Sequence, residues 1–485
     1  MCKEAAWKWI VEHESKMVAV SDRVWEFAEL GLQEFKSAAL IADTLEEFGF
    51  EVERGVADMP TAFVASYGSG HPVIGIMGEY DALPGLSQKP VTHKEPLEEG
   101  APGHGCGHNI HGVSGMAAAI AVKQSIESNN IDGSIKFFGC PAEENYSGKM
   151  FMVRDGLFDD VDVALSHHPG AFNWAGIGSS LAVNSVKFHF HGVSTHAAAS
   201  PDRGRSALDA VELMNTAVNY MREHVIQEAR IHYVIERGGM QPNVVPAYAR
   251  TWYYVRAPER NQVDHIYEWI LRIADGADLM ARTTHEVEFL EGTYNVLPNK
   301  KLSDIVTVNM REIGTPQYTD EEMDFANELL ETIPREEKMA ALRQTKRPGW
   351  EDLMDVTMDR SIPDPWDEGR IWPGSTDVAD VSWVTPTLEF NTATWVLGVP
   401  AHSWQAVALN GMSIGHKSLI FAAKVIAASS LDLIMKPELL EKVYDEFKER
   451  KHGRVYGSAV PQDIKPPLEA AKEAAEASRY VHTKS

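Results

Sequence analysis

The segment Pro102–Gly112 holds a thiol and three imidazoles in a glycine-rich stretch that precedes an apolar run. Cys106 and His108 are separated only by Gly107, and because glycine has no Cβ, both side chains can converge on one divalent ion. A thiolate beside an imidazole suits zinc, a borderline-soft cation. Taken alone, the segment is as typical of a turn whose histidines bond buried carbonyl groups. Three other segments decide between the two interpretations.

Potential metal ligands adjoin apolar runs at three more places. Ser134–Glu144 ends in two adjacent carboxylates, Val161–Pro169 ends in two histidines, and Ser413–Lys417 carries an imidazole before another apolar run. Neighbouring side chains past a strand end point in different directions, so one carboxylate can bind metal while the other faces a substrate. Together the segments supply enough N, O and S donors for two metal ions: Cys106, His108, Glu144, His168 and His416.

Strands and helices alternate over the first third of the chain. Residues 4–48 show helical spacing of apolar positions, short apolar strands follow, and residues 113–126 are expected to form a helix. This order predicts an α/β fold, a doubly wound and mostly parallel sheet whose ligand sites lie at the carboxyl ends of the strands.

The pattern changes at residues 184–296, where a β-α-β-β-α-β order predicts an inserted ferredoxin-like domain. The flanking parts, 1–183 and 297–453, are expected to form one metal-binding catalytic domain, because His416 must reach the same site as Cys106. Residues 454–485 are expected to be a peripheral tail. A loop rich in Pro and Trp, 348–373, is long enough to indicate either function or disorder.

Composition excludes several classes of protein. The 485 residues include 70 acidic and 45 basic ones, and a net charge of −25 disfavours nucleic acid and anionic membrane surfaces as partners. Three cysteines form no disulfide framework, and a metal-binding thiolate must stay reduced, so we expect a cytoplasmic location. The first residues predict neither a signal peptide nor a membrane span.

Several motifs resemble the amidohydrolase branch of the aminoacylase and carboxypeptidase family (peptidase family twenty), whose members are dinuclear metallopeptidases. Asn109 differs from the Asp usual in that branch, but it matches the B-type subunits of aminobenzoyl-glutamate hydrolases. The matching stretches extend over almost the whole chain: Gly78–Gln88, His104–Asn109, Gly204–Ala210, Ser375–Trp383 and Ile414–Lys417.

The resemblance implies two divalent ions per subunit, zinc or manganese, bridged by Cys106. It assigns His108 and His168 to one ion, and Glu144 and His416 to the other. Two cations lower the pKa of a bridging water, which makes a nucleophile available near neutral pH.

The resemblance also implies that Glu143 is the general base. Adjacency leaves an alternative open, in which Glu143 is the ligand and Glu144 supports it. His167 competes with His168 as a ligand, but B-type relatives keep the second position. Asp81 fits a carboxylate that orients a ligating imidazole, and it fits equally a turn-forming residue.

Four residues are implied in substrate recognition and catalysis. His196 matches the histidine that the inserted domain, acting as a lid and dimerisation domain, presents to the substrate carbonyl in the partner subunit's site, where it can stabilise an oxyanion. Asn243 resembles a substrate-binding asparagine, Arg256 is a candidate clamp for a substrate carboxylate, and Asp380 resembles an acidic residue near the active site.

The expected activity is metal-dependent hydrolysis of an N-acyl amino acid, an aroyl-glutamate such as p-aminobenzoyl-glutamate. The same site also suits a dipeptidase, an auxin-conjugate hydrolase or an aryl-amine hydrolase. A non-catalytic regulatory or binding subunit is the alternative from another class. The expected partners are a small-molecule substrate, a second copy of the chain in a homodimer, and a related A-type subunit.

Overall fold

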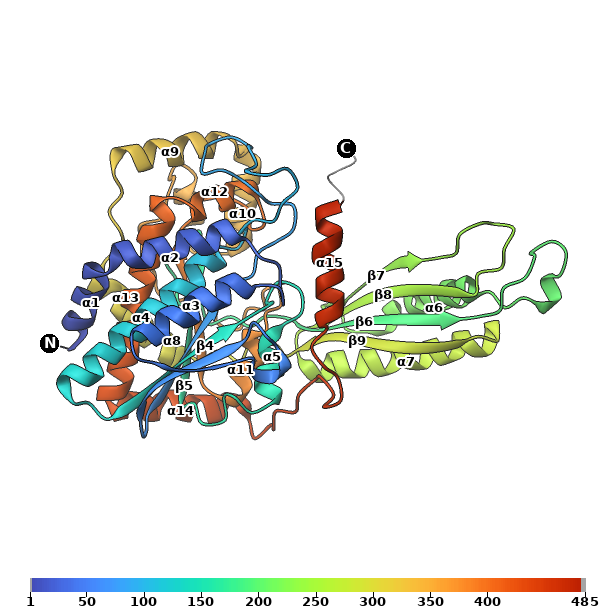
Figure 1. The fold of residues 1–485 in the computed structure, drawn as a ribbon, viewed down its shortest axis with the longest axis horizontal. Helices are drawn as coiled ribbons and strands as arrows, with labels where there is room; N and C mark the ends of the chain where they lie inside the picture. The colour runs from blue at the N-terminus through green and yellow to red at the C-terminus, as the bar shows by residue number, and fades with distance from the viewer. Residues whose placement is uncertain (1, 481–485) are drawn as a thin grey trace.

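The computed structural model describes residues 2–480, and its larger part is built on a six-stranded sheet (Figure 1). The strand order is β1-β2-β4-β3-β5-β10. The pairs β4/β3, β3/β5 and β5/β10 are parallel, whereas β1/β2 and β2/β4 are antiparallel. The strands are β1 (Glu51–Arg54), β2 (Phe63–Ser69), β3 (Val73–Glu79), β4 (Gly133–Cys140), β5 (Val163–Gly170) and β10 (Thr387–Ala393).

Helices cover both faces of this sheet, as the α/β prediction requires. The central helix on one face is α4, whose alanine- and glycine-rich residues are buried nearly all round because it lies between the sheet and further helices. That layer contains α1 (Cys2–Glu12), α2 (Glu14–Phe27), α3 (Phe35–Glu47), α4 (His108–Asn129), α8 (Lys300–Ile313), α13 (Ser413–Met435) and α14 (Pro437–Lys451). The short helices α5 (Gly148–Arg154) and α11 (Val378–Val384) pack together on the other face.

A smaller apolar cluster joins α9 (Asp320–Glu331) and α12 (Trp404–Asn410), and α10 (Arg335–Thr345) precedes the long loop. Helix α13 is long and apolar enough to cross a membrane, but 89% of its most apolar window is buried inside the protein. It is therefore a core helix, packed against α4 and α8.

A second sheet, order β7-β8-β6-β9 and antiparallel throughout, forms the inserted part, which extends away from the larger one (Figure 1). Period-two burial along β6 places Val186, Phe188 and Phe190 under the two helices. The β-α-β-β-α-β order agrees with the sequence prediction; the ferredoxin-like name and the lid role stay predictions. The elements are β6 (Ala182–His191), α6 (Ala207–Met221), β7 (Arg230–Arg237), β8 (Tyr248–Ala257), α7 (Arg260–Ala281) and β9 (Thr284–Thr293).

The C-terminal segment lies across the junction of the two parts and ends in helix α15 (Leu468–Tyr480) (Figure 1). Tyr456 donates a hydrogen bond to Asp380 in the larger part, and Tyr294, at the end of the insertion, donates to the carbonyl of Gly457. The segment therefore contacts both sides of the junction.

Candidate metal centre

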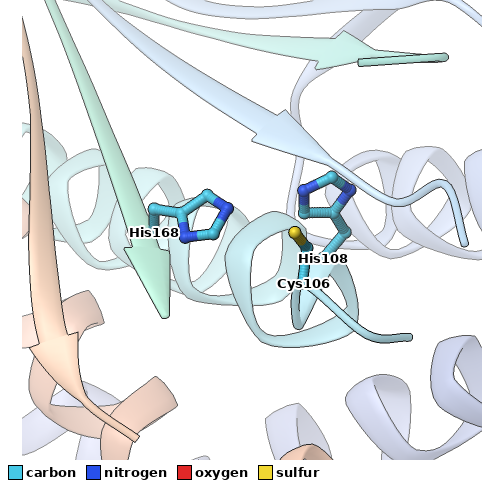
Figure 2. A group of neighbouring side chains, drawn as sticks. All are labelled: Cys106, His108 and His168. Atoms are coloured by element: carbon cyan, nitrogen blue, oxygen red, sulfur yellow. The ribbon is translucent and has the colours of Figure 1, made fainter. Parts of the chain in front are cut away.

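Segments far apart in the sequence bring metal-ligand side chains together at the carboxyl ends of the parallel strands. Cys106 lies in the turn that leads into α4, and His108 is the first residue of that helix. His168 comes from the end of β5, and its ring points toward the other two side chains (Figure 2). The ligand atoms of the three residues all lie within 4.8 Å of one another.

Both imidazoles of this group turn Nε2 toward the centre, because Nδ1 is occupied. His168 Nδ1 donates to the carbonyl oxygen of Pro169 at 2.7 Å, and His108 Nδ1 donates to Asp81 Oδ1 at 2.8 Å. Asp81 Oδ2 also accepts the backbone N–H of Glu144 at 3.0 Å. Asp81 therefore lies where a carboxylate that orients a ligating imidazole is expected.

A second group shares Cys106 and adds Glu144 and His402. His402 Nε2 lies 3.0 Å from Cys106 Sγ and 3.3 Å from Glu144 Oε2. Because the two groups share Cys106, its sulfur lies between two possible cation positions.

The predicted fifth ligand, His416, is not part of this cluster. It lies in the first turn of α13 and faces α2, where its Nε2 is 2.7 Å from Asp22 Oδ1. His402, in the loop before α12, takes the place expected of His416. The sequence signal was weaker there, since no strand end or glycine marks His402, which adopts a left-handed backbone conformation with φ 57°.

Two glycines allow the close approach of these segments. A Cβ on Gly105 would stand 3.1 Å from the Cα of His402, and Gly107 has φ +79°, a conformation that favours glycine. The glycine-rich turn thus lets the backbone of the Cys106 segment touch the loop that carries His402.

The two adjacent carboxylates point to different places. Glu144 belongs to the group with Cys106 and His402, whereas Glu143 lies beside Glu79 and His108. Burial, followed by the charges of Glu79 and Glu144, raises the pKa of Glu143 well above its ordinary value. Glu143 thus lies outside the two groups that share Cys106 but within reach of His108, and its role as the general base stays a prediction.

The potential ligand atoms of this cluster fit bound cations, because several of them are buried without a hydrogen-bond partner among the described residues. Glu79 Oε2, His108 Nε2 and Glu144 Oε1 are buried without a hydrogen-bond partner among the described residues. Glu79 Oε2 and His108 Nε2 stand 3.1 Å apart, yet they are not aligned as a hydrogen bond. Buried acceptors that face one another are costly unless a proton or a metal cation lies between them.

The electrostatics of Cys106 lead to the same conclusion. Burial, and then the charges of Glu144 and Glu143, raise the pKa of the Cys106 thiol well above its ordinary value. The protein alone therefore keeps the thiol neutral, and a thiolate at this position requires a metal cation.

Three other histidines use their ring nitrogens elsewhere. His167 contacts Ser114 Oγ and Thr392 Oγ1, and His104 Nε2 donates to the carbonyl of Val24. His111 Nδ1 accepts the backbone N–H of Glu79, and its Nε2 lies 3.0 Å from Ser166 Oγ, in a group with Glu79 and Glu389 that does not include Cys106. Of the histidine pair 167 and 168, the second is therefore the one that faces the cluster.

A buried ion network that the sequence did not reveal adjoins the cluster. Lys149 Nζ lies 2.5 Å from Glu79 Oε1 and 2.7 Å from Asp377 Oδ1, and all three side chains are buried. Burial alone would raise the pKa of Glu79, but the charges of His111 and Lys149 hold it below its ordinary value. Lys149 is thus a fixed positive charge behind the metal ligands.

His196 and Asn243 lie together on neighbouring loops of the inserted part. Residue 196 forms a backbone bridge with Val244, and the carbonyl of Asn243 accepts the N–H of Ala197. His196 is exposed, and its Nδ1 accepts two backbone N–H groups at 3.2 Å, so Nε2 carries the proton and is presented to solvent. These loops, after β6 and between β7 and β8, are at the end of the insertion farthest from the larger part (Figure 1).

Arg256 is half-buried on β8 and lines a cavity of about 660 Å³ together with Arg230, His232 and Trp372. Its guanidinium lies against the ring of Tyr254 and donates no hydrogen bond among the described residues. Donors without acceptors on a basic wall suit a carboxylate ligand.

Asp380, expected near the active site, lies in the first turn of α11. Its carboxylate is buried and accepts hydrogen bonds from the Tyr456 hydroxyl at 2.7 Å and the Tyr294 N–H at 3.1 Å. Burial raises its pKa to about 7. The acidic residue next to the cluster is Asp377, which pairs with Lys149. Asp377 directly precedes α11, whereas Asp380 lies within that helix and faces the C-terminal segment.

A doubly wound sheet with two linked groups of possible metal ligands at its strand ends, and a further carboxylate beside them, is typical of a metal-dependent hydrolase. Residues 75–355 match the model of Peptidase family M20/M25/M40, and the chain belongs to this family.

Relatives of known name agree with this assignment. The chain is 40% identical to the B-type subunit of p-aminobenzoyl-glutamate hydrolase from Escherichia coli over 456 residues, 92% of this chain and 95% of that one. It is 29% identical to the Xaa-Arg dipeptidase of Mus musculus, over 92% of both chains. Among solved structures, a dinuclear metal-binding peptidase of the M20 family from Bacillus subtilis has the same fold, with a TM-score of 0.55 and 16% identity over 87% of this chain and 99% of that chain.

Proposed function

We propose that this chain hydrolyses the amide bond of an N-aroyl amino acid such as p-aminobenzoyl-glutamate, using two divalent metal ions, zinc or manganese. The observation that carries the proposal is the pair of ligand groups that share Cys106, with Glu143 beside them. The substrate class is supported by the 40% identity to a hydrolase of that substrate.

Five residues would hold the metals: Cys106 as the bridge, His108 and His168 on one side, Glu144 and His402 on the other. When bound, the two cations supply Lewis-acid activation of a water molecule and of the scissile carbonyl. Asp81 fixes the tautomer of His108 by accepting its Nδ1–H, which leaves Nε2 free to ligate.

The chain's own residues then move the proton and hold the substrate. Glu143 takes a proton from the attacking water and passes it to the leaving amine. His196 donates its Nε2–H to the developing oxyanion, and Asn243 beside it contacts the substrate. Arg256 pairs with the carboxylate of the leaving amino acid.

Since His196 lies at the far end of the insertion, we propose that it serves the active site of the second chain in a homodimer. The edge strand β7 and helix α6 expose apolar side chains, with Val234 55%, Ile235 44% and Tyr220 68% exposed. Pairing of the two β7 edge strands across a two-fold axis would satisfy their unpaired backbone groups and give a closed dimer. The inserted ferredoxin-like domain would then act both as the dimerisation domain and as a lid over the metals.

Complementation tests the shared site. A Glu143→Gln chain and a His196→Ala chain, each inactive alone, are mixed and reassembled. Action across the dimer predicts that mixed dimers regain one intact site, so a mixture as inactive as its parents would exclude it.

A dipeptidase is the second candidate, favoured by the 29% identity to an Xaa-Arg dipeptidase. A non-catalytic role is disfavoured because the ligand groups and the base converge in one place. An A-type partner chain is proposed because the Escherichia coli relative is a B-type subunit, and a cytoplasmic location is proposed from the need to keep Cys106 reduced.

Activity on a substrate panel tests the function. Metal-loaded enzyme is assayed on N-aroyl amino acids, N-acetyl amino acids and dipeptides, with amino-acid amides as a check on the carboxylate clamp. Glu143→Gln should keep both metals and lose at least about 10²–10⁴-fold in kcat. Glu351→Gln, an exposed carboxylate after α10, is the matched control. Normal turnover of a metal-loaded Glu143→Gln enzyme would remove Glu143 from the role of base.

A further inference from the structure

A cavity of about 300 Å³ lies between the edge strand β10 and the junction of the two parts. Two tryptophans form one wall: the rings of Trp174 and Trp372 meet edge to face, with centroids 5.4 Å apart. Trp366 stacks behind Trp174 at 4.6 Å. The long loop before α11 therefore contributes an ordered aromatic wall.

The wall is held in place by polar contacts of the same loop. Asp367 accepts the backbone N–H groups of Ile177 and Gly178 and the indole N–H of Trp372. Arg370 lies over one face of the Trp372 ring, 3.6 Å from its centroid. The aromatic surface is thus built before any ligand arrives.

The other side of the cavity is acidic and runs along β10. Glu389 and Asn391 both line it, and the β5/β10 register places Asn391 beside His168 and Glu389 beside Ser166. The carboxylate of Glu389 therefore lies two residues, about 6–7 Å, below the level of His168 along the strand.

The charge of the lining restricts what can bind. Neither lysine, arginine nor histidine lines the cavity among the described residues. The Glu389 side chain is 24% exposed, and its Oε2 accepts a hydrogen bond from Ser166 Oγ and lies 3.7 Å from His111 Nε2, which leaves Oε1 for a ligand. Two further polar atoms without a partner among the described residues, the donor Trp174 Nε1 and the hydroxyl Ser375 Oγ, belong to the same lining, so the cavity also offers a hydrogen bond to an acceptor such as an acyl oxygen. An acidic cavity with indole walls suits an aromatic or cationic group that donates hydrogen bonds, and it repels a carboxylate.

We propose that this cavity binds the acyl ring of an amino-substituted aroyl substrate, with the ring against Trp174 and Trp372 and its amino group donating to Glu389. The proposal rests on the proposed function. A para-substituted ring is long enough to extend along β10 from the level of His168 to Glu389. The carboxylates of the leaving amino acid go elsewhere, to the basic wall that holds Arg256.

The test is a double-mutant cycle in which the amino group of the substrate and the carboxylate of Glu389 are removed singly and together. Hydrolysis of p-aminobenzoyl-glutamate and of benzoyl-glutamate is measured for the wild type, Glu389→Ala and Glu389→Gln. Because the amino group also changes the reactivity of the carbonyl, the result is read as the change in the ratio of kcat/KM between enzymes. A hydrogen bond to a charged acceptor predicts that this ratio falls roughly tenfold to a hundredfold in Glu389→Ala.

Glu389→Gln keeps a hydrogen-bond acceptor, so its ratio of kcat/KM for the two substrates should lie between the ratios of the wild type and of Glu389→Ala. Activity on benzoyl-glutamate should fall less than activity on p-aminobenzoyl-glutamate, because its ring makes no use of the carboxylate. An equal loss on both substrates, or an unchanged ratio, overturns the proposal, and so does a loss confined to dipeptides that end in arginine.

Binding to the wild type gives a readout that does not depend on how the variants fold. Calorimetry should show 4-aminobenzoate binding more tightly than benzoate, and equal affinity overturns the assignment of the cavity. Failure of the cavity proposal is distinguishable from failure of the function: if benzoyl-glutamate is hydrolysed, the function stands without the cavity. If metal-loaded wild type hydrolyses none of the N-acyl amino acids, both are overturned.

Discussion

Replacing Lys149 by methionine should strongly destabilise the protein. Methionine keeps most of the side-chain volume but removes the charge that lies 2.5 Å from Glu79 and 2.7 Å from Asp377. Two carboxylates are then left buried without a counter-charge. Removing one partner of a buried ion pair costs about 3–5 kcal/mol.

The size of the thermal shift follows from the length of the chain. An unfolding entropy of about 2.1 cal/mol/K per residue over 485 residues gives about 1 kcal/mol per kelvin. With the chain unfolding as one unit, the midpoint of Lys149→Met should therefore lie about 3–5 °C below that of the wild type.

The loss should depend on pH, with a definite sign. Burial already raises the pKa of Asp377 above its ordinary value in the folded state, and the loss of Lys149 removes the main charge that opposes this rise and one of the charges that lower the pKa of Glu79. Groups with raised pKa values in the folded state contribute stability that is complete below the unfolded pKa and is lost as the pH rises through the folded one. The deficit of Lys149→Met should thus be larger at about pH 8 than at about pH 5.5.

Thermal unfolding followed by circular dichroism on chelator-treated protein measures both effects, because bound metal would add its own stabilisation. Lys149→Met combined with Asp377→Asn is the matched variant, and it should recover part of the loss. A midpoint within about 1 °C of the wild type, or a deficit that grows toward low pH, would refute the reasoning.

Three further results are expected. His402→Ala should lose metal and activity together, whereas His416→Ala should keep both metals by elemental analysis; the reverse result restores His416 as the ligand. Cys106→Ser should lower metal content, since a neutral hydroxyl replaces a thiolate, and full occupancy of both sites would contradict the bridge. Burial, and then the charge of Asp81, raise the pKa of Glu34 to about 8, so stability present below the ordinary pKa is lost as the pH rises through about 8. Glu34→Gln should unfold at a higher temperature than the wild type above that pH, and identical pH profiles would show that Glu34 does not titrate this way.

Most of the fold could be predicted from local patterns. Period-two alternation marked the inserted strands, and the apolar stretch after His108 marked α4, because each pattern reports burial on one element. The antiparallel β1 and β2 were not distinguished from the parallel strands, since the direction of a short apolar strand depends on its neighbours.

The site was predictable where ligands follow strand ends, as with Glu144 and His168. His402 was missed because it lies in a loop whose position is set by contact with Gly105, almost 300 residues away in the chain. Lys149 was missed for the same reason: its partners Glu79 and Asp377 are 70 and 228 residues distant in sequence. A single lysine at the start of an apolar helix is equally typical of a solvated end.

The arrangement of charges explains why fold stability and metal binding are coupled here. Glu79, Glu143 and Glu144 crowd one region, and Lys149 neutralises part of their charge. The remaining negative charge makes the metal-free site costly, and burial together with this charge raises the pKa values of Glu143 and of the Cys106 thiol, which favours their protonated forms when no cation is bound. Under the proposed function, metal binding would therefore release protons, free Glu143 to act as the base and stabilise the fold together. The charge of Lys149 offsets part of this electrostatic cost in the metal-free protein.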